Sequence, residues 1–293
     1  MRFMIEQDGI TVKQFLTGQQ HVSHRLLVRL KQNRGIFCNG QPVWVTHRCH
    51  AGDWIEIRFP DVISSGLPQE DIPLDIVYED ETMLVINKPP GMPPHPSYLH
   101  AHGTAAGAVA GYYARNGIQT QVRALGRLDR NTSGLMVFGK NPLVQENMVR
   151  QQQHGMVSKL YLAVVQGEIT QHKGTIEAPI GRKPGSMIER CVCPEGKPAR
   201  TSYEVLRQGE RYAVLLLLPA TGRTHQLRVH MAYLGHPLAG DTLYGGTVED
   251  LDRHALHAYQ LSLQHPVTGK QIEFQAPLPQ DMRHLIDKEG LVW

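Results

Sequence analysis

Residues 124–140 read ALGRLDRNTSGLMVFGK, and the predicted fold is built around this stretch. Its apolar run, 135–138, is rich in strand-forming residues and predicts a buried β-strand. Just before this run, Arg127, Asp129 and Arg130 crowd together, and four turn-forming residues separate them from the strand. These turn formers place the charged cluster on a loop that enters the strand.

The charged cluster on this loop has two interpretations. Because opposite charge within a few ångströms favours an anion, the carboxylate of Asp129 should stay ionised between its two guanidinium neighbours. An ionised carboxylate on a loop held by a rigid sheet suits a nucleophile or a base. The other interpretation is a surface ion-pair cluster that caps a turn, since structural ion pairs also perturb charges. The cluster taken alone leaves both interpretations open.

The composition is typical of a cytoplasmic protein. The chain has 293 residues and a net charge of +3. No run approaches the ~18 apolar residues needed to span a bilayer, and no signal-peptide pattern opens the chain, so we expect a soluble protein without membrane contact. Four cysteines fit a reduced compartment. Cys191 and Cys193 form a single Cys-x-Cys pair, so the sequence predicts no metal, and the thiols are interpreted as incidental.

The first 60 residues form a basic segment, with eight Lys and Arg against four Asp and Glu, whereas the other 233 residues hold 22 against 23. Such a segment suits a polyanionic partner. A helix is predicted over 24–33 with Ser23 as its cap. An Asn-Gly turn predicts a hairpin, and alternating apolar residues predict one strand more. These strands are expected over 36–38, 43–45 and 54–59.

This segment resembles the S-four-like RNA-binding domain of ribosomal and RNA-modifying proteins. The resemblance implies an RNA-binding domain over 1–60. A polar stretch with Pro and Gly over 61–73 reads as a linker. Arg25 and Arg29 lie four residues apart on one helix face, where like charges favour an anionic partner. The usual binding face of such domains maps onto Ser23, Arg25, Arg29, Lys31 and Arg34.

From residue 74 onward, apolar β-prone runs alternate with helical segments. Strands are predicted over 75–78, 83–86, 159–165, 200–207 and 211–218, with a final hairpin over 257–276. Helices are predicted over 104–115, 141–152 and 224–234, with Thr104, Asn141 and Thr224 as caps. The predicted fold class is therefore α+β. A small α+β domain precedes a mixed, mainly antiparallel sheet with flanking helices over 74–293.

Two side chains outside the opening stretch are candidates for function. Tyr161 lies on the strand predicted over 159–165. Arg223 stands where a strand meets a helix, and a helix amino terminus favours anions. His225 and His230 are five residues apart and do not share a helix face, which argues against a zinc pair. Taken alone, the tyrosine reads as a core residue and the arginine as a helix-end ion pair.

Four segments together resemble the RluA/RluD-type RNA pseudouridine synthases, in the order that this family shows. The resemblance spans about residues 75–280, and an S-four-like domain in front is usual for RluD-like members. One position departs from the family pattern, because Gly126 stands where a His usually precedes Arg-Leu-Asp. The segments are INKPPGMPPHP (86–96), GRLDRNTSGLMVFGK (126–140), KLYLAVVQG (159–167) and GRTHQLRVHMAYLGHPLAGDTLYG (222–245).

The resemblance implies an RNA-uridine isomerase, an intramolecular transferase. In this reaction the N-glycosidic bond of a uridine breaks, and C5 of the base bonds to C1′ of the ribose. Redox balance is unchanged and no group is lost, so no cofactor is expected. Asp129 matches the catalytic aspartate, which either adds to C1′ or takes the 2′ proton. Arg223 matches the arginine that pairs with this aspartate and keeps it ionised.

The resemblance also assigns residues that hold the substrate. Tyr161 matches the active-site tyrosine that stacks on the target base, a contact worth ~1–3 kcal/mol. Arg127 matches a residue that fills the space left by the extruded uridine. Leu227 and Arg228, in the same segment as Arg223, are assigned to substrate binding.

RNA is the expected partner, and the RluD-like architecture favours large-subunit ribosomal RNA as the target. Two alternatives stay open. The first is the same chemistry on transfer RNA. The second is a non-catalytic RNA-binding factor in ribosome assembly that has kept only the fold. The protein is expected to act as a monomer.

Overall fold

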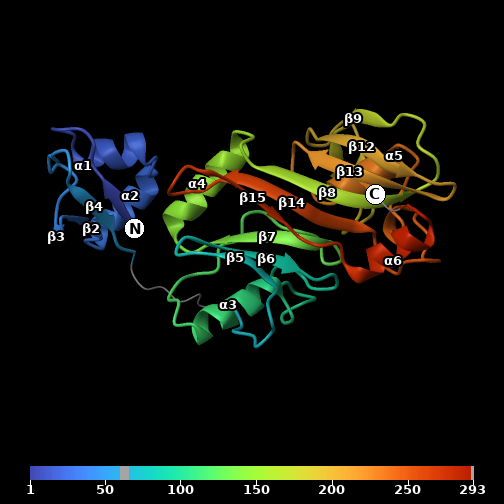
Figure 1. Ribbon diagram of the computed structural model, residues 1–293, viewed down its shortest axis with the longest axis horizontal. Helices are drawn as coiled ribbons and strands as arrows, with labels where there is room; N and C mark the ends of the chain where they lie inside the picture. Colours follow the sequence, from blue (N-terminus) through green and yellow to red (C-terminus); the bar gives the residue numbers. More distant parts are fainter. Residues whose placement is uncertain (60–65, 292–293) are drawn as a thin grey trace.

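The computed structural model describes residues 1–59 and 66–291. A small amino-terminal domain lies at one end of a long twisted sheet (Figure 1). The linker predicted over 61–73 falls partly outside the described residues. Within its described part, the Glu70 carboxylate accepts hydrogen bonds from the backbone N–H groups of Gly103 and Thr104 (2.9 and 3.1 Å). This part of the chain is therefore tied to the residues just before helix α3.

The amino-terminal domain is a four-stranded sheet, in the order β1-β4-β2-β3, packed against short helices. Helix α2 forms as the sequence predicts, because the Ser23 Oγ accepts a hydrogen bond from the Leu26 N–H (3.1 Å) and three leucines face the core. The elements are β1 (Arg2–Met4), α1 (Val12–Gln14), η1 (Phe15–Gln19), α2 (His24–Gln32), β2 (Ile36–Cys38), β3 (Gln41–Pro42) and β4 (Trp54–Ile57).

The hairpin of this domain confirms the Asn-Gly turn but not the second strand predicted over 43–45. Asn39 and Gly40 both have positive φ angles, 49° and 79°, as a two-residue hairpin turn requires. Pairing therefore resumes at once, with Gln41 opposite Cys38. The residues predicted as a strand follow the last paired residue.

The second sheet has nine strands in the order β5-β6-β7-β14-β8-β13-β12-β9, with β15 paired to β14. Every pair is antiparallel except β7 with β14, which is parallel. The predicted mixed, mainly antiparallel α+β class is thus confirmed. Its strands are β5 (Ile76–Glu79), β6 (Met83–Lys88), β7 (Ser133–Gly139), β8 (Ser158–Gln166), β9 (Lys173–Glu177), β12 (Arg200–Gln208), β13 (Tyr212–Pro219), β14 (Leu256–Gln264) and β15 (Gln271–Gln275).

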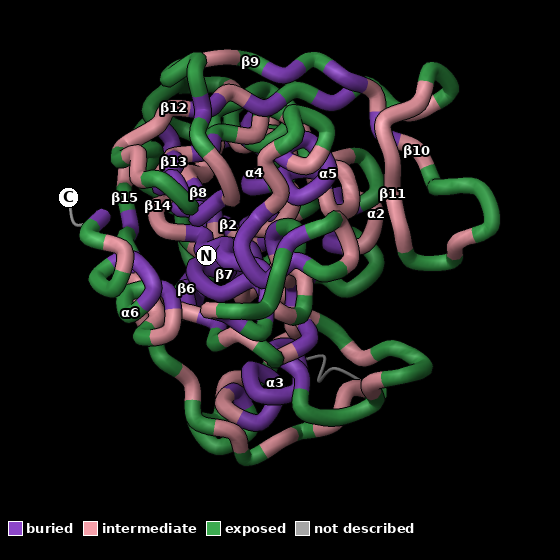
Figure 2. The backbone as a smooth tube through the Cα atoms, turned by 90° about the vertical axis from the view of Figure 1, so that its right-hand side faces the viewer, coloured by how far each residue is buried: buried purple, intermediate pink, exposed green. Residues whose placement is uncertain are grey.

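A separate two-stranded hairpin, β10 (Ile180–Arg182) with β11 (Arg190–Val192), projects from the side of this sheet (Figure 2). The strands at the centre of the large sheet are mostly buried, whereas the tip of this hairpin is exposed. Met187 and Ile188 near the tip are 86% and 61% exposed.

Helices flank the large sheet, and two of the three predicted caps are confirmed. Thr104 and Asn141 accept backbone hydrogen bonds from Gly107 and Val144. The third cap is wrong, because α5 begins at Gln226 and not after Thr224. The helices are α3 (Ala105–Arg115), α4 (Pro142–Gln153), α5 (Gln226–Tyr233), the 3-10 turn η2 (Thr242–Tyr244) and α6 (Gln280–Lys288).

The two domains touch where α2 meets α4. The backbone N–H and the Oγ of Ser23 donate hydrogen bonds to the Glu146 carboxylate (3.2 and 2.6 Å). Leu143 of α4 is buried in the same apolar cluster as the core of the amino-terminal domain. A buried leucine and a charge-assisted hydrogen bond at one contact fix the start of α2 against the larger domain.

Candidate active site

Asp129 lies on the loop that leads into β7, as the sequence predicts. Its carbonyl accepts a hydrogen bond from the Thr132 N–H (3.1 Å), which closes the turn. The loop is held by two residues just before β14. Arg253 donates to the carbonyl of Asn131 (3.0 Å), and Thr132 Oγ1 is 2.8 Å from His254 Nε2. The backbone around the carboxylate is therefore held on several sides.

Lys88 is a second anchor of this loop that the sequence does not reveal as functional. It ends β6 and is fully buried. Its Nζ donates to three carbonyls, those of Pro89, Met92 and Arg130 (2.7, 2.9 and 3.0 Å). Burial lowers the pKa of Lys88 to about 7, whereas the negative charge of Asp129 opposes this shift. The only sign of this anchoring role in the sequence is the position of the lysine at the end of an almost wholly apolar strand.

Arg228 is the guanidinium that reaches the catalytic candidate. Its Nη1 lies 3.5 Å from Asp129 Oδ2, and its side chain is only 9% exposed. The same guanidinium donates two hydrogen bonds of 2.7 Å to the carboxylate of Asp241. It also lies over the ring of Tyr244, 4.9 Å from the ring centre. A bidentate partner and a stacked ring fix the cation that faces Asp129.

The pairing predicted for Arg223 is wrong. Its Nε donates to the carbonyl of Pro198 (3.0 Å), and its backbone N–H donates to the Gln226 side chain (3.0 Å). Among the described residues, no ion pair joins it to Asp129. The reason is local, because α5 starts at Gln226 and its first turn turns Arg228 toward the aspartate.

His225 completes the polar side of the site. It adopts a left-handed backbone conformation (φ 58°) directly before α5. Its Nε2 is 3.9 Å from Asp129 Oδ2, and its Nδ1 is 2.8 Å from the Tyr244 hydroxyl. That hydroxyl also accepts the N–H of Arg190 (3.0 Å), so its own proton is free for His225. Burial lowers the pKa of His225, although Asp129 opposes the shift, so the imidazole tends to the neutral form.

Tyr161 forms the apolar side of the site. It lies on β8, is 8% exposed, and belongs to the same buried cluster as Leu128 and Leu227. Burial raises the pKa of Tyr161, and the nearby charge of Asp129 adds to this shift. The phenol is therefore protonated at neutral pH. The charge of Asp129 thus acts on Tyr161, and Leu227 belongs to the same apolar cluster as Tyr161.

Gly126 and Arg127 lie at the open edge of the site, and both are exposed. The φ of Gly126 is +76°, a conformation that favours glycine. A Cβ at this position would lie 3.2 Å from Lys159 Nζ. The glycine that replaces the family histidine therefore brings the chain close to a lysine of β8.

One group of metal-ligating side chains lies elsewhere. Cys38, His47 and Cys49 offer ligand atoms that all lie within 4.8 Å of one another in the amino-terminal domain. The sequence interpretation of incidental thiols concerned Cys191 and Cys193 and does not address this group. Cys38 and Cys49 are buried in the core of the domain, whereas His47 is exposed. Burial raises the pKa of the Cys49 thiol to about 11.

The described helices include none long and apolar enough to cross a membrane. The described part of the chain offers a carboxylate, a fixed guanidinium, a neutral imidazole and an aromatic face around one point. This arrangement suits a reaction in which a carboxylate acts on a substrate whose flat group rests on Tyr161.

Comparison with known proteins agrees with this chemistry. Residues 82–233 match the model of the RNA pseudouridylate synthase family. The chain is 44% identical over 283 residues to the uncharacterized RNA pseudouridine synthase YjbO of Bacillus subtilis (strain 168), covering 96% of this chain and all of that protein. It is 41% identical over 232 residues to ribosomal large subunit pseudouridine synthase D of Escherichia coli (strain K12), covering 74% and 71% of the two chains.

Among solved structures, human RNA pseudouridylate synthase domain containing 1 superposes with a TM-score of 0.59 at 28% identity. The match covers 77% of this chain and 98% of the human one. The family match spans three of the four segments in full, including the Asp129 loop, Tyr161 and α5, and the relatives extend over most of the chain. The chain therefore belongs to the RNA pseudouridylate synthase family, in its RluA/RluD group, whose members isomerise uridine in RNA.

Proposed function

We propose that Asp129 is the catalytic carboxylate of this isomerase and that its target is a uridine of large-subunit ribosomal RNA. The observation that carries the first part is the contact of Asp129 with the buried Arg228, which places a fixed positive charge beside the carboxylate. Ionisation is needed both for attack on C1′ and for removal of the 2′ proton.

The reaction conserves atoms and electrons. The bond between N1 and C1′ breaks, the uracil turns over, and C5 bonds to C1′. The proton on C5 leaves, and N1 takes one up. The target base must leave the RNA stack to reach Asp129, at a cost of a few kcal/mol. We propose that Tyr161 and Leu227 hold the extruded base on their apolar side, and that Arg127 takes its place in the RNA.

Arg223 has a different proposed role from the one its sequence position suggests. It is half-buried and donates to the carbonyl of Pro198, and no ion pair of the described residues joins it to Asp129. We propose that Arg228 is the cation that pairs with the catalytic carboxylate. The guanidinium of Arg228 cannot also bind substrate freely, because two of its nitrogens are bonded to Asp241.

The amino-terminal domain is proposed to hold the RNA backbone. Arg25, Lys31 and Arg34 are exposed on or next to α2, and Arg29 is half-buried on the same helix. The Ser23 hydroxyl is bonded to Glu146 and to the Leu26 N–H, so we assign this residue to domain contact and not to RNA. Relatives named for the ribosomal large subunit support ribosomal RNA as the target.

The test uses purified protein with large-subunit ribosomal RNA and, separately, with transfer RNA transcripts. Pseudouridine has the mass of uridine, so it is read by a carbodiimide adduct that stops reverse transcription. We expect Asp129→Asn to bind RNA and form no product, whereas Asp252→Asn, at an exposed acid, keeps wild-type activity.

Full activity of Asp129→Asn would overturn the assignment of the carboxylate. Product on transfer RNA alone would move the target to that class. A wild-type protein that binds both RNAs and leaves every uridine unchanged would support the non-catalytic alternative.

A further inference from the structure

A cavity of about 510 Å³ lies where the amino-terminal domain meets the larger domain. It is distinct from the Asp129 site, and none of the residues that surround Asp129 lines it. Residues from both domains do so, and four of them are basic. Those basic residues are Arg29, Arg58, Arg123 and Lys140.

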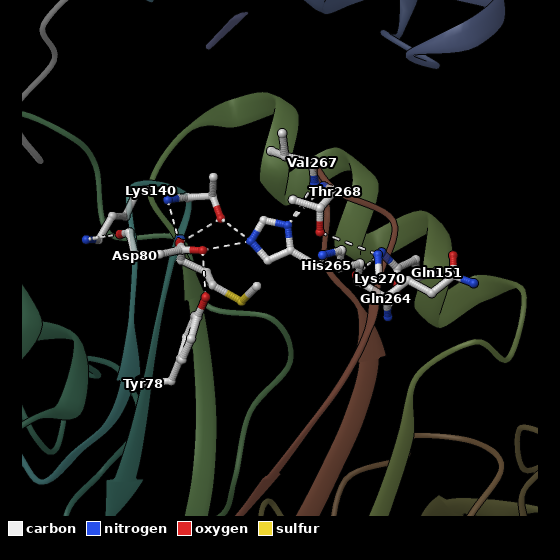
Figure 3. Close-up of polar contacts among 11 residues, drawn as sticks. Tyr78, Asp80, Lys140, Gln151, Gln264, His265, Val267, Thr268 and Lys270 are labelled. Carbon is white, nitrogen blue, oxygen red and sulfur yellow. Dashed lines mark hydrogen bonds and ion pairs between the residues drawn. The ribbon is translucent and has the colours of Figure 1, made fainter. Parts of the chain in front are cut away.

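Two of the four cations are already neutralised. Lys140 Nζ donates to the Glu79 carboxylate (2.7 Å) and to the carbonyl of Asp80. Figure 3 shows this lysine beside the turn of Asp80, whose own carboxylate is 2.7 Å from His265 Nε2. Arg58 Nη2 donates to the Glu56 carboxylate (2.9 Å). Neither cation requires a further anion.

Arg29 and Arg123 differ from these two. Arg123 is only 9% exposed, and its guanidinium donates to neutral oxygens of Thr120 and Gln121. Within the described residues, no carboxylate is bonded to either guanidinium. The lining includes one acid, the exposed Glu81.

The two guanidinium groups also act on each other across the domain boundary. Burial lowers the pKa of Arg123, and the positive charge of Arg29 lowers it further. Two like charges from different domains that face one cavity repel each other in the free protein. An anion between them would turn this repulsion into two attractions, and guanidinium groups bind phosphate with paired hydrogen bonds.

We infer that this cavity binds a backbone phosphate of the substrate RNA, held between Arg29 of α2 and Arg123 of the larger domain. The identity of the anion as RNA rests on the proposed function. Bound in this way, the RNA would bridge both domains and fix their relative position, while the target uridine enters the separate Asp129 site.

The test measures RNA affinity directly, by titration at several salt concentrations, so that it does not depend on catalysis. We expect Arg29→Gln and Arg123→Gln each to weaken binding by about tenfold and to flatten the salt dependence by about 0.7–0.9 in log–log slope. Because both contact one phosphate, the double variant should be little weaker than either single variant. Arg283→Gln, at an exposed arginine of α6, is the matched control.

A charge reversal gives the sharpest readout. Arg29→Glu places a carboxylate in the cavity opposite Arg123. We expect the free protein to melt at a higher temperature in low salt, because repulsion becomes attraction, while RNA binding falls further than in Arg29→Gln. This variant also covers the case in which Arg123→Gln fails to fold, since no hydrogen bond of the described residues depends on the Arg29 side chain.

The outcomes separate this site from the proposed function. Unchanged RNA affinity and salt slope in the Arg29 variants, with isomerase activity intact, would overturn the phosphate site alone. Arginine-dependent RNA binding without isomerase activity would overturn the proposed function and support the site. If inorganic phosphate raises the melting temperature through Arg29 and Arg123 while RNA affinity does not depend on them, the anion is free phosphate and the RNA assignment is wrong.

Discussion

Arg228 contacts two carboxylates, and only one of them is the catalytic candidate. Asp241 holds the guanidinium by two short hydrogen bonds, and Asp129 lies at the remaining nitrogen. This geometry makes Asp241 a positioning residue for the cation. Removing one partner of such a buried pair costs about 3–5 kcal/mol of stability, because the other charge is left unpaired.

We therefore predict that Arg228→Lys folds but loses at least 100-fold in the single-turnover rate, because lysine cannot make the bidentate contact and reach Asp129 together. Arg223→Lys, the matched variant in the same segment, should stay within a few-fold of wild type. Rapid-quench assays on saturating RNA measure both rates. A larger loss for Arg223→Lys than for Arg228→Lys would contradict the geometry.

Tyr161 permits a separate test of ring and hydroxyl. Because burial raises its pKa, the phenol is a poor base at neutral pH, so its aromatic face should matter more than its oxygen. We predict that Tyr161→Phe keeps the rate within about tenfold and that Tyr161→Ala loses about 10–100-fold through lost stacking. Single-turnover rates and RNA affinity separate the two. Equal, severe losses in both variants would assign the C5 proton transfer to the hydroxyl.

At the scale of residues, the sequence proposes the carboxylate, the tyrosine and the leucine as site residues, because each stands in a distinctive segment. It cannot choose between Arg223 and Arg228, which are both in GRTHQLR. Five residues along a helix place two side chains on different faces, so the choice depends on where the helix begins. The helix starts after His225, which has a left-handed backbone conformation. The sequence does not show this, because the neighbouring Thr224 is a good helix cap and predicts an earlier start. Lys88 was likewise hidden, since its partners are carbonyls.

At the scale of elements, the parallel pair β7–β14 decides where the Asp129 loop emerges. Gly134 pairs with Ala258 across it, and its φ is +109°. A Cβ here would lie 2.3 Å from the carbonyl oxygen of Ala258, closer than any real contact. Only glycine therefore allows the two backbones to approach at this point.

We predict that Gly134→Ala lowers the free energy of unfolding by more than about 3 kcal/mol, since it adds both strain and a backbone clash. Gly18→Ala, where the φ is not positive and the space is open, should change stability little. Urea denaturation followed by circular dichroism measures both. A Gly134→Ala protein with wild-type stability would show that the strands separate more easily than the structure indicates.

Local signals explain which elements the sequence could predict. Strand β7, helix α3 and the hairpin β14–β15 have apolar periodicity, caps or a turn within their own residues. The second strand of the β2–β3 hairpin was predicted too far along the chain. Val43 and Val45 alternate as in a strand, but the residues that pair with β2 are Gln41 and Pro42. The parallel partner of β7 lies more than a hundred residues along the chain, and nothing local specifies it.

At the scale of the whole molecule, the sequence predicts the fold class and an uneven charge, but not how the two domains meet. The contact of Ser23 with Glu146 joins residues 123 positions apart. The cavity beside Arg29 and Arg123 lies between the same two domains. The excess of basic residues in the amino-terminal segment can be counted from the sequence. Only the packed structure shows which of these cations have no carboxylate partner among the described residues.

Buried histidines should set the acid stability of the whole molecule. Burial lowers the pKa of His254 to about 2 and of His257 to about 4, against about 6.5 in an unfolded chain. Below pH 6.5 the unfolded state therefore binds protons that the folded state does not. The stability from these neutral histidines is complete above pH 6.5 and is lost as the pH falls toward each folded value, by up to about 1.4 kcal/mol per pH unit for each.

We predict that the free energy of unfolding in urea falls steadily from pH 6.5 to pH 4. The slope of this fall measures the protons taken up on unfolding, and His257→Gln should reduce that number by about one. Glutamine can still bond to Ser133 and to the carbonyl of Ala276, which contact the imidazole in the wild type. His284→Gln, at an exposed site on α6, should leave the slope unchanged. A neutral buried imidazole at His257 must take up a proton on unfolding, so its removal must change the slope. If both variants keep the wild-type slope, the acid sensitivity comes from the carboxylates instead.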